Sequence, residues 1–147
     1  MKTLFTSFAL VLAFAAQAQV SRFNGFPLDA NTSERLKGSV VEVYVDGILK
    51  ETKQVKGKKI KVKHEGKGAV IIKVSKAGYD DIYFGMDYSA APVDTKSALD
   101  IPIRMTLQGT GKGDETLASD WIYNPKEETP IECNIVTQGE LKARLKR

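Results

Sequence analysis

Residues 38–84 read GSVVEVYVDGILKETKQVKGKKIKVKHEGKGAVIIKVSKAGYDDIYF, and the alternation within this stretch decides the fold. Val41, Val43 and Val45 fall on one side of an extended chain, with Glu and Tyr between them. A period of two is typical of a strand with one buried face. Asp46-Gly47 follows at once and is a strong hairpin signal, because both residues tolerate the positive φ of a tight turn. The stretch therefore predicts consecutive strands.

The lysine-rich middle of this stretch keeps the same alternation. Ile60 and Val62 point to one face of a predicted strand, while Lys59, Lys61 and Lys63 point to the other. The following strand again places apolar residues inward, at Val70, Ile72 and Val74. Regularly spaced strands, glycine turns and the lack of an amphipathic helix predict an all-β, antiparallel β-sandwich of about seven strands.

The clearest single strand is expected at residues 98–107. Apolar residues occupy every second position there, from Leu99 to Leu107. Pro102 lies among them and cannot donate a hydrogen bond to a neighbouring strand. We therefore expect this strand at the edge of a sheet.

The N-terminal residues 1–18 predict a secretory signal peptide. Lys2 precedes the apolar run Leu4–Ala16, and Ala16-Gln17-Ala18 suits cleavage after Ala18. The run is shorter than the roughly 20 residues that cross a bilayer, and no cysteine for a lipid anchor follows the cleavage site. We expect an exported protein, periplasmic or at the cell surface or extracellular, and at most peripheral to the membrane.

The remaining chain divides into three predicted segments. Residues 19–36 have no sustained period and predict an extended lead-in. Residues 37–108 form the predicted β-sandwich domain. Residues 109–147 are expected to be an irregular, partly packed C-terminal extension, in which residues 131–136 suit one more strand and the end is frayed.

The charge of the chain is polarised along the sequence. Residues 50–76 contain ten lysines against two glutamates, whereas residues 77–132 contain eleven acids against four bases. Such a basic segment attracts acidic partners by long-range steering. Nucleic acid is disfavoured as that partner, because the protein is expected to be exported and its basic segment has few arginines and aromatics.

Residues 37–84 and the strand at 98–107 resemble a known family. The opening G-x-V-x-V-Y-V-D-G, the turn-strand-turn-strand middle and the closing K-A-G-Y are similar to the carboxypeptidase regulatory-like β-sandwich domains of exported proteins in Bacteroidetes-type bacteria. These domains are related in fold to prealbumin, so the resemblance implies a prealbumin- or immunoglobulin-like sandwich. Where family members commonly carry a Thr-Asp-x-x-Gly turn, this chain retains only Gly57.

The resemblance implies a non-enzymatic accessory or interaction module that acts by protein-protein contact in the cell envelope. The hydrolase related to prealbumin relies on several histidines and a C-terminal Tyr-Arg-Gly-Ser. This chain has a single histidine, His64, and ends in Leu-Lys-Arg. No catalytic residue, metal ligand or cofactor is therefore predicted, and a lone histidine among lysines is a poor zinc site.

Two further features leave alternatives open. The acids Asp80, Asp81, Asp87 and Asp94 either hold calcium or are solvated loop residues, and their spacing matches no EF-hand loop. Cys133 is the only cysteine, so it is a buried apolar group, a free thiol or a link to a partner. Unpaired cysteine is often buried, which favours the first alternative.

The lysine-rich strand is the candidate contact surface. Lys59, Lys61 and Lys63 project from one side of a strand at intervals of about 7 Å. A surface of this kind suits an acidic protein, an acidic glycan or the phosphates of lipopolysaccharide; the alternative is a solvated edge whose lysines prevent aggregation. The predicted surface comprises Lys56, Lys58, Lys59, Lys61, Lys63 and Lys73.

Trp121 and Tyr123 form a second, aromatic candidate. The two rings lie two residues apart in the sequence. They either make a platform on which a sugar stacks or cover one end of the core, and large aromatic residues are mostly buried.

Overall fold

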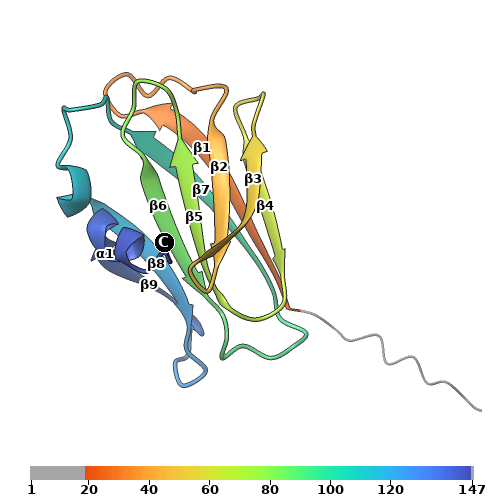
Figure 1. Cartoon of the computed structure of the whole chain (residues 1–147). Coiled ribbons are helices and arrows are strands. Elements are labelled where there is room, and N and C mark those ends of the chain that lie inside the picture. The colour runs from red at the N-terminus through yellow and green to blue at the C-terminus, as the bar shows by residue number, and fades with distance from the viewer. Residues whose placement is uncertain (1–18, 147) are drawn as a thin grey trace, which may run out of the picture.

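The structure, a computed structural model that describes residues 19–146, is a sandwich of two β-sheets (Figure 1). One sheet has the strand order β4-β1-β7 and the other β3-β2-β5-β6-β8-β9. The signal peptide predicted at residues 1–18 lies outside the described residues. The elements are β1 Val20–Asp29, β2 Val40–Val45, β3 Ile48–Gln54, β4 Ile60–Glu65, β5 Ala69–Ser75, β6 Ile82–Asp87, β7 Lys96–Met105, a 3-10 turn Gly113–Glu115, β8 Leu117–Tyr123, β9 Ile131–Thr137 and α1 Gln138–Ala143.

The predicted β-sandwich is confirmed, and so are two of its local signals. Asp46 and Gly47 have φ values of 50° and 82° and form the tight turn between β2 and β3. Pro102 lies in β7, which is an edge strand and pairs only with β1. Its missing N–H therefore costs no hydrogen bond with a second neighbour.

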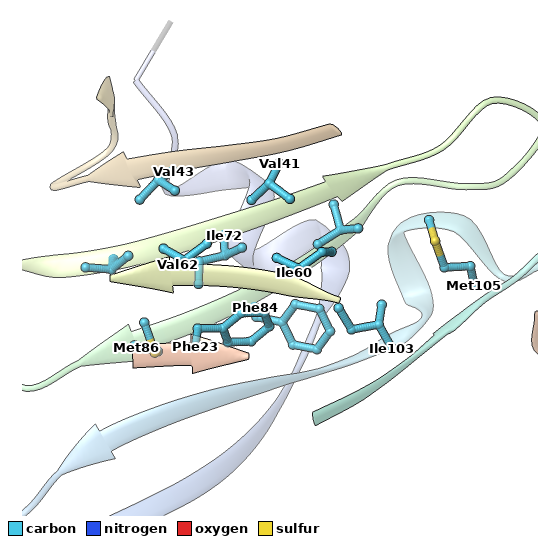
Figure 2. Packing of buried hydrophobic residues seen from close by; sticks show 12 residues of the cluster. Phe23, Val41, Val43, Ile60, Val62, Ile72, Phe84, Met86, Ile103 and Met105 are labelled. Carbon is cyan, nitrogen blue, oxygen red and sulfur yellow. The ribbon is translucent and has the colours of Figure 1, made fainter. Parts of the chain in front are cut away.

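The core lies between the two sheets and is built from the alternating residues. Val41, Ile60, Ile72 and Ile103 are fully buried, and each comes from a different strand. Phe23 of β1 packs against Phe84 of β6 with ring centroids 5.3 Å apart, and Figure 2 shows these rings among the aliphatic side chains. Burial of these apolar side chains is the main force that holds the two sheets together.

The lead-in predicted at residues 19–36 is wrong in its boundary, because β1 is the central strand of the three-stranded sheet. It pairs with β4 on one side and with β7 on the other. The inward positions include Ser21, Gly25 and Pro27, while the outward ones include Phe26 and Leu28. Apolar residues therefore do not alternate along β1, and the strand is held by pairing on both sides. The sandwich begins at Val20 and not at residue 37.

The irregular C-terminal extension is also a prediction that the structure corrects. β8 and β9 extend the six-stranded sheet, so the sandwich has nine strands, and α1 follows β9 directly. Thr137 caps α1: its hydroxyl accepts from the Glu140 N–H, and the Glu140 carboxylate accepts from the Thr137 N–H. This reciprocal pair satisfies two N–H groups that a helix start leaves free.

The end of the chain is packed and not frayed over its described residues. Leu141 of α1 is fully buried with Ile71, Tyr83 and Ala118, on the outer face of the six-stranded sheet. The Lys146 N–H donates to the Gly47 carbonyl at 2.8 Å, so the chain end reaches the β2–β3 turn.

An ion pair between a buried carboxylate and Arg144 stabilises the packing of the chain end on the sheet. Asp120 of β8 is 4% exposed at its side chain and accepts a hydrogen bond from Arg144, with Nη1 and Oδ2 2.8 Å apart. A Cβ atom at Gly85 of β6 would lie 2.2 Å from Asp120 Oδ1. Glycine at position 85 therefore leaves the space that this ion pair occupies.

The antiparallel pairing that we predicted holds for most neighbours but not for all. β1 pairs with β7 in parallel, and β6 pairs with β8 in parallel. Both pairs join strands that are far apart in the sequence, for which no hairpin signal exists. Among the described residues, none of the helical segments has the length and apolarity needed to cross a membrane.

Candidate functional site

The pairing of β1 with β4 gathers positive charge on the outer face of the three-stranded sheet. Arg22 lies directly opposite Lys63, and Asn24 lies opposite Lys61. Directly opposed side chains on one face have Cβ atoms about 5 Å apart. We call this surface the cationic face; it comprises Arg22, Asn24, Phe26, Arg35, Lys59, Lys61 and Lys63.

Phe26 anchors one end of the cationic face. The Arg35 guanidinium lies 5.1 Å from the centroid of its ring, and the Lys59 ammonium lies 5.0 Å from it. Both distances are within the range of a cation–π interaction. The half-buried ring therefore holds two long cationic side chains beside the strand, so that the charges stand in a more fixed arrangement than free surface lysines would.

A hollow of about 380 Å³ opens beside this surface. β3 of the other sheet borders it, since the Lys53 ammonium donates to the Lys61 carbonyl at 3.3 Å. Lys53 also pairs with Glu51 at 3.2 Å. The hollow is lined by Arg22, Asn24, Glu51, Lys53, Lys61, Val62 and Lys63. Four of these seven residues carry a positive charge, so the hollow suits an anionic group.

Few acids oppose this charge. Lys63 pairs with Glu65, and the hydrogen bond from Lys63 lowers the pKa of Glu65 below its usual value. Asp100 of β7 lies opposite Asn24, on the far side of β1 from the lysines. Exposed ion pairs of this kind hold their partners weakly, so an incoming anion can compete for Lys63.

The lysines predicted as one contact surface lie in two places. Lys59, Lys61 and Lys63 are exposed on the cationic face, and Lys56 and Lys58 are exposed in the connection that leads to it.

Lys73 lies elsewhere. It is on β5, where its ammonium group lies 2.7 Å from Glu42 and 3.6 Å from Asp81. Burial alone would lower the pKa of Lys73, but the hydrogen bond that its ammonium donates to Glu42 and the charge of Asp81 raise it to about 12. Lys73 therefore does not belong to the predicted surface.

The aromatic pair does not form an open platform. Trp121 stacks on Phe84 with ring centroids 6.2 Å apart and an angle of 24° between the ring planes. It is partly buried against the core, and Tyr123 is partly buried as well. One face of the indole is thus occupied, which favours the alternative that the pair covers the core.

The acidic loop residues are not brought together. Asp81 pairs with Lys73, and Asp87 accepts hydrogen bonds from Ser89. Asp80 and Asp81 line a separate hollow of about 280 Å³, which Asp114, Arg104 and Lys142 also line. Within residues 19–146 no group of three or more His, Cys, Asp or Glu side chains is placed to hold a metal ion.

His64 and Cys133 lie far apart in the fold. His64 is partly buried on β4, opposite Ser21, and its Nε2 atom is buried without a hydrogen-bond partner among the described residues. Cys133 lies on β9 and is exposed, so the expectation that it is buried is wrong. Its position on an edge strand, with one neighbour only, explains the exposure.

Sequence analysis missed four members of the cationic face: Arg22, Asn24, Phe26 and Arg35. They lie in the segment that we expected to be a lead-in. Polar residues at Arg22 and Asn24 with Phe23 between them were a weak signal of a strand whose outer face continues the lysines. The sequence carries no local signal that this strand pairs with β4.

The comparisons with known proteins do not identify a family. No family model matches the chain, and no curated protein matches it. A chlorocatechol 1,2-dioxygenase from Pseudomonas putida is similar in structure over 73% of this chain and 64% of that enzyme, with 13% sequence identity and a TM-score of 0.39. The match thus spans less than two thirds of the enzyme, and at this similarity it carries no argument. The resemblance to the carboxypeptidase regulatory-like domains stays a prediction.

Proposed function

We propose that the protein is a non-enzymatic accessory module of the bacterial cell envelope, exported to the periplasm or the cell surface, which binds an acidic surface of a partner protein. The observation that carries this proposal is the cationic face. Arg22, Lys61 and Lys63 stand in adjacent register on two paired strands, beside a hollow that further positive charge lines.

The arrangement suits binding more than solubility alone. Lysines that only prevent edge-to-edge aggregation are needed on the edge strand β4. Arg22 and Asn24, however, lie on the central strand β1, where no edge needs protection. Arg35 comes from the loop after β1, yet it meets Lys59 at the ring of Phe26. Charges collected from three separate segments form a continuous patch, and such patches raise the rate of association with acidic partners.

Charge reversal tests this proposal. The variant Arg22→Glu/Lys61→Glu/Lys63→Glu is expected to recover at least about tenfold less of its envelope partner than the wild type after crosslinking in cells and affinity capture, because steering by a charged patch contributes about 10- to 1,000-fold to association rates. Captured proteins would be quantified by mass spectrometry.

A matched control carries the same change in net charge elsewhere. Lys67→Glu/Lys112→Glu/Lys126→Glu reverses three exposed lysines outside the cationic face and should recover the partner as the wild type does. Equal losses in both variants would show that net charge alone matters. Recovery of no specific protein by the wild type would count heavily against protein binding.

A second candidate function is the binding of an acidic glycan or of lipopolysaccharide phosphates, and the hollow beside Arg22 favours it. A guanidinium presents two parallel donors to a phosphate or carboxylate, and Asn24 offers a neutral donor next to it. The partner would then be a small anionic group seated in the hollow and not an extended protein surface.

Retention on immobilised lipopolysaccharide tests this second candidate. Retention of the wild type should weaken as salt is raised, since the attraction is screened. Arg22→Lys keeps the charge but removes the paired donors, so it is expected to elute at lower salt than the wild type. Retention that is unchanged in Arg22→Glu/Lys61→Glu/Lys63→Glu would exclude the cationic face as the binding site.

A further inference from the structure

The strand β9 leaves one edge of the six-stranded sheet open. Among residues 19–146 it pairs with β8 alone, and hydrogen bonds at both ends define which of its residues bond to β8. The Gln138 N–H donates to the Thr116 carbonyl at 2.8 Å, and the Asn124 N–H donates to the Pro130 carbonyl at 2.6 Å. Because hydrogen-bonded pairs alternate along antiparallel strands, the main-chain groups of residues 131, 133 and 135 point away from β8.

This edge lacks the protection that the other edges have. β3 carries Lys50, Glu51 and Lys53, and all its residues are exposed. β4 carries the lysines of the cationic face, and β7 contains Pro102. β9 reads IECNIVT, with a single charge and no lysine or proline. An edge strand with high β-propensity and without such charges or proline can pair its free main-chain groups with another strand.

The side of the sheet next to this edge is apolar. Ile131, Cys133 and Ile135 alternate on one side of β9, and Leu117 lies on the same side of β8. Leu117 is 68% exposed and Ile135 is 63% exposed, which makes them the most exposed large hydrophobic side chains within residues 19–146. α1 does not cover them, because its buried residue Leu141 packs on the opposite face, against Ile71, Tyr83 and Ala118.

We propose that β9 pairs with the β9 strand of a second copy of this chain, antiparallel and with Cys133 opposite the partner's Cys133. In this register Ile131 lies opposite the partner's Ile135, and roughly six main-chain hydrogen bonds form, two for each outward-facing residue. The two six-stranded sheets then continue into each other. This inference does not depend on the cationic face.

Charge and side-chain type favour a second copy in this register. Glu132, the only charged residue of β9, lies opposite the partner's Asn134, so no like charges meet. A register with its symmetry axis at Glu132 would place two carboxylates directly opposite each other, which is destabilising. The strand therefore complements itself, in its main chain, its apolar side and its charge.

A disulfide between the two Cys133 residues provides a test of this register. In a hydrogen-bonded antiparallel pair the Cα atoms lie about 5.5 Å apart, within the range of about 4.4–6.8 Å that a disulfide allows. Glutathione disulfide is the oxidant: one Cys133 thiolate attacks it and releases one glutathione, and the partner's Cys133 then attacks the mixed disulfide and releases the second. Two electrons thereby pass from the two Cys133 thiols to glutathione disulfide, which is reduced to two glutathione molecules, and the dimer is linked covalently.

The first experiment measures the crosslink in the full chain. With glutathione disulfide, the wild type should give a disulfide-linked dimer on a non-reducing gel, at least about tenfold faster than Cys133→Ser/Asn134→Cys, whose exposed cysteine would face the partner's Glu132. Cys133→Ser/Ile131→Cys and Cys133→Ser/Ile135→Cys should each form no disulfide-linked dimer alone but crosslink when mixed. Equal crosslinking at all positions, or none for the wild type, would overturn the pairing.

The second experiment measures assembly without a disulfide. Under reducing conditions, sedimentation should detect a concentration-dependent dimer for the wild type that Ile135→Lys abolishes. Ile48→Lys is the matched control, because it adds a lysine at an exposed position of β3, at the opposite edge of the same sheet. A wild type that stays monomeric at high concentration, or that binds a foreign strand instead of its own copy, would contradict the proposal.

Discussion

Replacement of Phe23 by alanine is expected to lower the free energy of unfolding by about 3–5 kcal/mol, the usual cost of removing a buried aromatic side chain. Phe23 is fully buried on β1 and packs on Phe84 across the sandwich. Domains are commonly stable by only about 5–15 kcal/mol, so this single change removes a large fraction of the total. Urea unfolding followed by the fluorescence of Trp121, the only tryptophan, measures it.

Phe26→Ala is the matched control for this prediction. It removes the same side chain from the same strand, but from the outer face, where Phe26 is only half-buried beneath Arg35 and Lys59. Its expected cost is about 1 kcal/mol, from lost cation–π contact and partial burial. Similar costs at both positions would show that β1 is not a core strand.

Replacement of Leu141 by alanine is expected to cost about 2–5 kcal/mol of unfolding free energy. Leu141 is fully buried between α1 and the six-stranded sheet. Its removal leaves a cavity next to Tyr83, whose backbone N–H donates to the buried side chain of Gln138. Hydrogen exchange at the Tyr83 amide should therefore become faster in this variant, in addition to the change seen by urea unfolding.

Lys142→Ala is the matched control, because it shortens the next side chain of α1 to alanine without touching the buried cluster around Leu141. Lys142 is exposed and lies 3.6 Å from Asp114, an exposed pair of the kind that contributes about 0–1 kcal/mol. Its replacement should leave the Tyr83 amide protected. If the wild-type amide already exchanges freely, α1 is not docked in solution and the prediction fails.

The sequence predicts the part of the fold in which strands that are consecutive along the chain pair with each other. The β2–β3 hairpin follows from Asp46-Gly47 and from the alternation of valines, and the edge position of β7 follows from Pro102. These features depend on turn chemistry and periodicity over a few residues. Such local signals are visible in a single sequence.

The position of β1 could not be predicted in the same way. Its inward residues include a serine, a glycine and a proline, so the hydrophobic alternation is lost. The strand exists because β4 and β7 satisfy its main-chain groups on both sides. The same holds for β8, whose parallel pairing with β6 depends on residues distant in the sequence.

The sequence predicts only part of the candidate site. The lysines of β4 indicate a charged outer face, but Arg22 and Asn24 join them only through the pairing of β1 with β4. Lys73 shows the opposite error, because it is close to the other lysines in sequence and lies among Glu42 and Asp81 in the structure. Charge counted along a chain does not state on which sheet the charge lies.

The parallel pairing of β1 and β7 also sets an order of events in folding. Val20 at the start of β1 pairs with Lys96, and Asp29 at its end pairs with Met105. Because a chain is synthesised from its N-terminus, β1 is available long before its second neighbour, β7, has been made. Closing so long a loop is slow compared with forming a hairpin. The first strand to be made is thus among the last to complete its pairing, and until β7 pairs with it, β4 is its only partner in the sheet.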